Sequence, residues 1–167
     1  MSLGDRVLNL SKRIKQYVDF LYPVYVPTYT PKTVAEYTFD DIYNVVMRSG
    51  DIGRPDYWQV LDNRYWVTTV DDFREIVSRD WTKHRRYIDD RFDCDNFALH
   101  FVARINAMYG LNSVGIVIDY DAAHAYNLAI VIDGGNLRKV VIEPQTGEIL
   151  YRPDGNLHKL QNWVLIM

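Results

Sequence analysis

One cysteine, one histidine and one glutamate in this sequence could together carry out nucleophilic chemistry. Cys94 is the single cysteine of the 167-residue chain, so it is either a buried apolar side chain or a reactive thiol. It follows Asp93, a suitable helix N-cap, and the positive end of a helix dipole stabilises a thiolate. His124 can accept the thiol proton, and Glu143 can orient the imidazole. These three residues form the predicted catalytic group.

The spacing of His124 and Glu143 places them on neighbouring strands. The glycines of Asp133-Gly134-Gly135-Asn136 predict a two-residue hairpin turn, because both central positions can take positive φ. In that register Glu143 is the same-face diagonal neighbour of His124, about 7 to 8 Å away between Cα atoms. Each of the three residues alone has a more ordinary explanation, as a core cysteine, a strand-edge histidine or a solvated strand end. Their combination favours a site.

The elements that must position these residues follow from the hydrophobic pattern. Strand-like runs occur at 64–68, 113–120, 125–133, 137–143, 149–152 and 163–167. Helical spacing occurs at 5–21, at 38–46 after a capping box, from 69 onward, and from Cys94 until Gly110. Prolines and tyrosines from 22 to 37 predict an extended connector. Helices first and strands second predict an α+β fold, with the Cys94 helix packed on an antiparallel sheet.

Length and composition limit the class of protein. A chain of 167 residues with 48% hydrophobic content fits one domain, 1–167, with 1–60 as a helical and Tyr/Pro-rich extension and 61–167 as the catalytic core. A net charge of −3 provides no basic field for nucleic acid. The sequence has no secretory signal pattern and no run near the roughly 20 apolar residues of a membrane span. We therefore expect a cytoplasmic protein without membrane or nucleic-acid partners.

Three sequence blocks resemble a known family. They are Phe92-Asp93-Cys94-Asp95-Asn96-Phe97-Ala98, His124-Ala125-Tyr126-Asn127 and Glu143-Pro144-Gln145-Thr146-Gly147. They are similar to the cysteine, histidine and acid blocks of papain/transglutaminase-like cysteine hydrolases, and most of all to the papain-like C-terminal domain of a fungal agglutinin and its bacterial and phage relatives. The resemblance covers about residues 65–148, and Asn96 departs from the aspartate that is frequent there.

The resemblance implies a papain-like (transglutaminase-like) fold, with Cys94 as nucleophile, His124 as general base and Glu143 as orienting acid. The sugar-binding trefoil of the agglutinin has no counterpart in this sequence, so its lectin activity does not transfer. Its protease is calcium-dependent, and several aspartates could supply oxygen ligands, although their spacing matches no defined calcium loop. They are Asp89, Asp90, Asp93, Asp95, Asp119 and Asp121. We otherwise expect no metal or cofactor.

Further residues have side chains that could act near the thiol. The candidates for a side-chain donor to the oxyanion are Gln59, Trp66 and Gln145, since preformed donors usually contribute most in acyl transfer. His100 lies about 240° around the helix from Cys94 at 3.6 residues per turn, which excludes it as the base. His84 and His158 lie in polar segments and are expected at the surface.

The sequence thus predicts a cysteine protease or amidase that cleaves a peptide or protein substrate through an acyl-enzyme intermediate. Three alternatives stay open. One is a non-enzymatic phage or bacterial binding or assembly module on the same fold, with homo-oligomers formed through the N-terminal helix and arm. The others are a transglutaminase and a cell-wall amidase.

Overall fold

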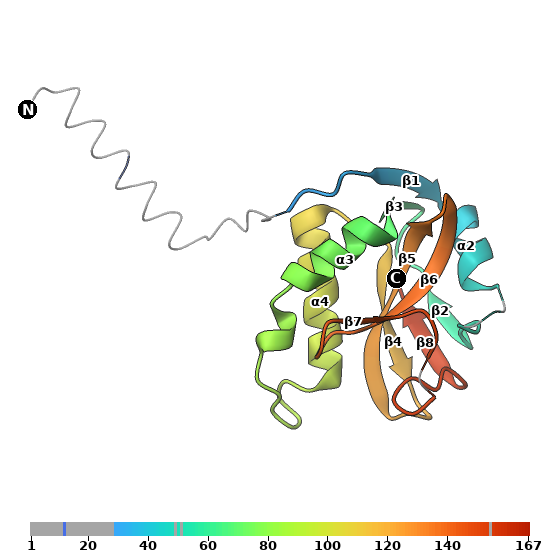
Figure 1. Ribbon diagram of the computed structural model, residues 1–167. Helices are drawn as coiled ribbons and strands as arrows, with labels where there is room; N and C mark the ends of the chain where they lie inside the picture. Colours follow the sequence, from blue (N-terminus) through green and yellow to red (C-terminus); the bar gives the residue numbers. More distant parts are fainter. Residues whose placement is uncertain (1–11, 13–28, 49, 51, 154) are drawn as a thin grey trace, which may run out of the picture.

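A six-stranded sheet forms the centre of the computed structural model, which describes residues 12, 29–48, 50, 52–153 and 155–167 (Figure 1). The strands, in spatial order, are β2 (Tyr57–Gln59), β8 (Trp163–Ile166), β4 (Val114–Asp119), β5 (His124–Asp133), β6 (Asn136–Glu143) and β7 (Glu148–Leu150). β2 pairs with β8 in parallel, and the other neighbours are antiparallel. A second, two-stranded sheet joins β1 (Val34–Thr38) to β3 (Arg64–Thr68).

The helices begin at the caps that the sequence predicts. Thr38 and Asp41 form a capping box at α2 (Phe39–Val46), and the Thr69 side chain accepts from the Asp72 N–H at α3 (Val70–Arg79). A short 3-10 turn, η1 (Thr82–His84), lies before the longest described helix, α4 (Cys94–Tyr109). Gly110 ends α4 at φ 65°, in the left-handed region that glycine adopts without steric cost. The predicted helix at 94–109 is confirmed.

Two hydrophobic layers cover the two faces of the sheet, with α2 on one side and α3 and α4 on the other (Figure 1). Strand β5 contributes side chains to both layers, because successive strand residues point to opposite faces of the sheet. Tyr126, Leu128 and Ile130 belong to the α2 layer, and Ala129 and Val131 belong to the α3/α4 layer. β5 is therefore buried on both faces.

The hairpin between β5 and β6 has the predicted register. Gly134 and Gly135 take φ values of 56° and 81°, and the pairing runs outward from the turn to Asn127 opposite Ile142. A slip of one residue would have exchanged the faces of every side chain on β6. The glycine turn and the hydrophobic alternation therefore agree on which residues of β5 and β6 share a face.

Two strands were missed by the sequence pattern. β2 has only three residues and depends on its partner β8, and β1 lies inside the segment that we expected to be an extended connector. Together with α2, they bring residues 34–59 into the packed layers. The helix predicted at 5–21 lies outside the described residues. Over the part of the chain that is described, no helix has the length and apolar character of a membrane span.

A buried lysine fastens the end of α2 to the sheet. Lys139 of β6 is 9% exposed, and its Nζ donates to the carbonyl oxygens of Val46, Arg48 and Gly53 at 3.0, 2.9 and 2.7 Å. The last carbonyls of a helix lack partners within the helix, so this contact satisfies one of them. Burial lowers the pKa of Lys139 to about 8, with a smaller contribution from the charge of Arg48.

We predict that Lys139→Met lowers the free energy of unfolding by about 1 to 3 kcal/mol at pH 7, because buried carbonyls lose their donor. The pKa of Lys139 in the folded state lies below the unfolded value of 10.5. At pH values between the two, the native state therefore binds fewer protons than the unfolded state. The stability advantage of wild type over the variant therefore grows as the pH rises from about 8 to 10.5.

Urea unfolding at pH 7, 8 and 10 measures both effects. Lys159→Met is the matched control, because Lys159 is exposed and donates to one carbonyl, that of Asp121. Equal losses for the two variants, or a wild-type advantage that shrinks with pH, would contradict the role of Lys139.

Candidate functional site

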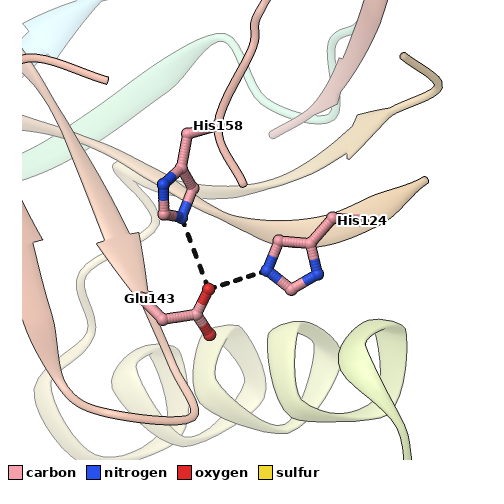
Figure 2. A group of neighbouring side chains, drawn as sticks. All are labelled: His124, Glu143 and His158. Carbon is pink, nitrogen blue, oxygen red and sulfur yellow. Dashed lines mark hydrogen bonds and ion pairs between the residues drawn. The ribbon is translucent and has the colours of Figure 1, made fainter. Parts of the chain in front are cut away.

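Glu143 lies between two histidines, where the inner strands β5 and β6 of the sheet begin and end (Figure 2). It is the last residue of β6 and His124 is the first of β5, whereas His158 comes from the segment between β7 and β8. Oε2 of Glu143 lies 2.7 Å from Nε2 of His124 and 3.4 Å from Nε2 of His158. The predicted contact between His124 and Glu143 is confirmed, and a second imidazole joins it. We call these three residues the His-Glu-His cluster.

The carboxylate of this cluster is held in its ionised form. Burial would raise the pKa of Glu143, but hydrogen bonds from His124, His158 and the Gln145 backbone N–H outweigh it and lower the pKa to about 2. The Gln145 N–H reaches Oε1 at 3.0 Å. Both carboxylate oxygens therefore accept hydrogen bonds, which fixes the orientation of the group.

A buried aspartate positions the segment that carries His158. Oδ2 of Asp119 accepts from the Tyr126 hydroxyl at 2.9 Å and from the Leu160 backbone N–H at 2.8 Å, and Oδ1 accepts from the Ala122 N–H at 3.1 Å. The Tyr126 ring meets the His158 ring edge-on, with centroids 4.6 Å apart. Asp119, which is fully buried, thus fixes both the segment after His158 and the ring against which His158 packs.

The prediction that His158 lies at the surface was wrong, since the residue is 3% exposed. Its neighbours in sequence mix apolar and polar residues without helical or strand periodicity, so no local signal could have found it. Its burial depends on Asp119, which is distant in sequence. The other two histidines lie outside the cluster: His84 is exposed, and His100 packs on Trp81 with its Nδ1 3.1 Å from the Thr82 hydroxyl.

Cys94 occupies the first turn of α4 and is partly buried. The Asp93 backbone N–H donates to Oδ1 of Asn96 at 3.2 Å, so Asn96, the departure from the family pattern, helps to cap the helix. Among the described residues, the donor atoms of His124, Glu143 and His158 lie within 4.8 Å of one another, and Cys94 does not belong to this group. No hydrogen bond in the described part of the chain joins its thiol to His124.

The three oxyanion candidates are spread over the molecule. Gln145 contacts the cluster, through its backbone N–H. Gln59 is exposed on β2, where its side chain bonds the Tyr57 hydroxyl and the Val60 carbonyl. Trp66 lies on β3 and is 41% exposed. Of the three candidates, the structure therefore brings Gln145 to the His-Glu-His cluster, and the contact is made by its backbone N–H and not by its side chain.

The aspartates proposed for calcium also lie in different surroundings. Asp119 uses its oxygens for the three internal hydrogen bonds described above. A hydrogen bond that the protonated Asp95 donates to Asp93, followed by burial and by the charge of Asp93, raises the pKa of Asp95. Asp89, Asp90 and Asp121 are exposed. The calcium site stays a prediction.

A second candidate surface is formed by three aromatic rings at α2 and β2. Phe39 and Tyr43 lie one turn apart on α2, and the Trp58 ring stacks on both, at 5.7 and 6.0 Å between centroids and interplanar angles of 26° and 23°. Tyr43 is 44% exposed. The polar residues Asp40 and Asn44, which follow Phe39 and Tyr43 in the sequence of α2, are exposed. We call Phe39, Tyr43 and Trp58 the aromatic face.

We predict that Asp119→Asn lowers the free energy of unfolding by about 1 to 3 kcal/mol, because an amide nitrogen would replace one of the acceptor oxygens and leave a buried donor unsatisfied. Amide hydrogen exchange should rise at Leu160 before it rises at the centre of β5. Asp121→Asn is the matched control, since Asp121 is exposed. A variant with wild-type stability and unchanged exchange at Leu160 would contradict the anchoring role.

Comparisons with known proteins identify lectin domains. The model of the family described as ricin-type beta-trefoil lectin C-terminal domain matches residues 12–155. Two solved structures also match: "PSL1a-E64 complex", with 21% identity and a TM-score of 0.57, and a Polyporus squamosus lectin bound to Neu5Aca2-6Galb1-4GlcNAc, with 21% identity and a TM-score of 0.58. The match covers 79% of this chain and 51% and 49% of those chains, so the chain spans about half their length. No curated protein matches.

These comparisons overturn the identification as a papain-like cysteine hydrolase. The predicted protease or amidase activity, the acyl-enzyme mechanism and the enzymatic alternatives are corrected with it, because the matches are lectins. A peptide substrate has no support in them either. The identification failed because its evidence was local. Capping rules predict a helix that begins at the cysteine, and turn rules predict a hairpin that pairs the histidine with the glutamate. Such rules position residues without determining an activity.

The predicted fold class is corrected as well. Instead of a papain-like α+β domain built on a central cysteine helix, the comparisons assign a lectin-type fold, rich in strands and with a few helices. The individual helices and strands were mostly predicted correctly, and the error lay in the family to which they were attributed. Since the family match extends over most of the sequence, the chain belongs to the ricin-type beta-trefoil lectin C-terminal domains.

Proposed function

We propose that this domain is a non-catalytic binding module and that its ligand is a glycan held on the aromatic face. The single observation that carries the proposal is the set of three stacked rings at α2 and β2, with Tyr43 44% exposed. Membership of a lectin family supports the same class of ligand.

The chemistry of the aromatic face suits a sugar ring. A pyranose has one face made of C–H groups, which packs on an aromatic ring, while its hydroxyls need hydrogen-bond partners around that ring. Asp40 and Asn44, each next in sequence to an aromatic residue of this face, are exposed and offer a carboxylate and an amide. The rings are already stacked on one another, so little conformational freedom would be lost on binding.

The similar solved structures suggest which glycans to test first. One of the similar solved structures is a lectin bound to Neu5Aca2-6Galb1-4GlcNAc. The present chain corresponds to about half of that lectin, so the sugar specificity of the longer protein is a starting point for testing.

A glycan array probed with the labelled chain tests this proposal, followed by calorimetry with the best glycan. We predict that Tyr43→Ala weakens binding about tenfold, because one stacking aromatic contributes about 1 kcal/mol or more. Tyr43 is half exposed, so the variant should fold normally, which circular dichroism verifies.

Tyr120→Ala is the matched control, since Tyr120 is also exposed, at 60%, and is absent from the aromatic face. It should bind like wild type. If no glycan binds the chain, or if both variants bind as wild type does, the aromatic face is not a glycan site.

A further inference from the structure

We propose that the His-Glu-His cluster binds one zinc ion through Nε2 of His124, Nε2 of His158 and a carboxylate oxygen of Glu143. The donor atoms of these three residues all lie within 4.8 Å of one another, and no other such group of His, Cys, Asp and Glu occurs among the described residues. The inference is independent of glycan binding, because it uses different residues.

Two of the three distances between ligand atoms can be compared with those of a tetrahedral site. Metal–nitrogen distances of about 2.0 to 2.1 Å and metal–oxygen distances of about 2.0 to 2.2 Å place neighbouring tetrahedral ligands roughly 3.3 to 3.5 Å apart. The His158 Nε2 to Glu143 Oε2 distance is already 3.4 Å. The corresponding His124 distance is 2.7 Å, so a small rotation of the His124 ring would admit the ion.

The type and burial of the ligands favour zinc over calcium. Two imidazoles and one carboxylate form a known zinc ligand set, whereas calcium prefers six to eight oxygens. The side chains of His158, Glu143 and His124 are 3%, 8% and 11% exposed. His124 is thus the most accessible ligand, and a fourth position beside it would be open to water or to another ligand.

The surroundings of the cluster hold its members in place. The Gln145 N–H fixes the second oxygen of Glu143, and the Tyr126 ring lies against both imidazoles, with centroids 5.6 Å from His124 and 4.6 Å from His158. Loss of a hydrogen bond to a zinc ligand, such as the one from Gln145, typically weakens metal binding about 10- to 100-fold. The site would therefore be largely formed before the metal arrives.

Metal binding also determines which nitrogen of each imidazole ring carries a proton. Each Nε2 is engaged by the carboxylate in the metal-free protein, which requires the ring proton on Nε2. Coordination through Nε2 leaves the proton of each neutral ring on Nδ1. Zinc binding therefore removes the Nε2 proton of both histidines, which nitrogen-15 NMR detects directly.

Titration of the metal-free full chain with zinc chloride, followed by calorimetry, tests the proposal. We expect one ion per chain, a rise in Tm, and intense visible absorption when cobalt replaces zinc, as tetrahedral sites give. His158→Gln and Glu143→Gln should weaken binding at least 10-fold, and His84→Gln, an exposed histidine, should leave it unchanged.

Two results would overturn the proposal. One is the absence of stoichiometric zinc binding by the wild-type chain. The other is binding that survives both cluster substitutions, or that is lost in His84→Gln. Because a cluster variant could fail to fold, the wild-type NMR experiment decides independently: zinc that binds without moving the ring protons of His124 and His158 rules the site out.

Discussion

The buried carboxylate of Glu143 is the interaction on which the organisation of this edge of the sheet depends. It accepts hydrogen bonds from residues of three segments: His124 at the start of β5, Gln145 after β6, and His158 before β8. An ionised carboxylate with little access to water is stable only if its lone pairs are satisfied. This one requirement links the β5–β6 hairpin to a segment that the strand pattern does not place.

Buried polar groups fasten irregular segments at two further positions. Asp119 receives three donors and fixes the segment that ends at Leu160, and Lys139 donates to three carbonyls and fixes the segment after α2. In each case one side chain from a strand supplies the hydrogen bonds that the loop backbone lacks. Each candidate site lies next to one of these segments: His158 belongs to the segment that Asp119 fixes, and Phe39 and Tyr43 lie on α2, directly before the segment that Lys139 fixes.

Much of this architecture could be predicted from local sequence rules. Capping residues placed the starts of α2, α3 and α4, and the Gly134-Gly135 turn fixed the register that puts Glu143 beside His124. His158 could not be predicted, because its burial comes from a long-range contact through Asp119 and from packing on Tyr126. The family was also assigned wrongly, because helix caps and hairpin turns recur in domains with different functions.

The state of the two imidazoles tests the central role of Glu143 most directly. Nitrogen-15 NMR of the metal-free chain should show the proton on Nε2 of both His124 and His158, with both signals changing in Glu143→Gln while those of His84 stay in place. An Nε2 without a proton on either cluster ring, or a His158 signal that does not respond to the loss of the carboxylate, would contradict this account.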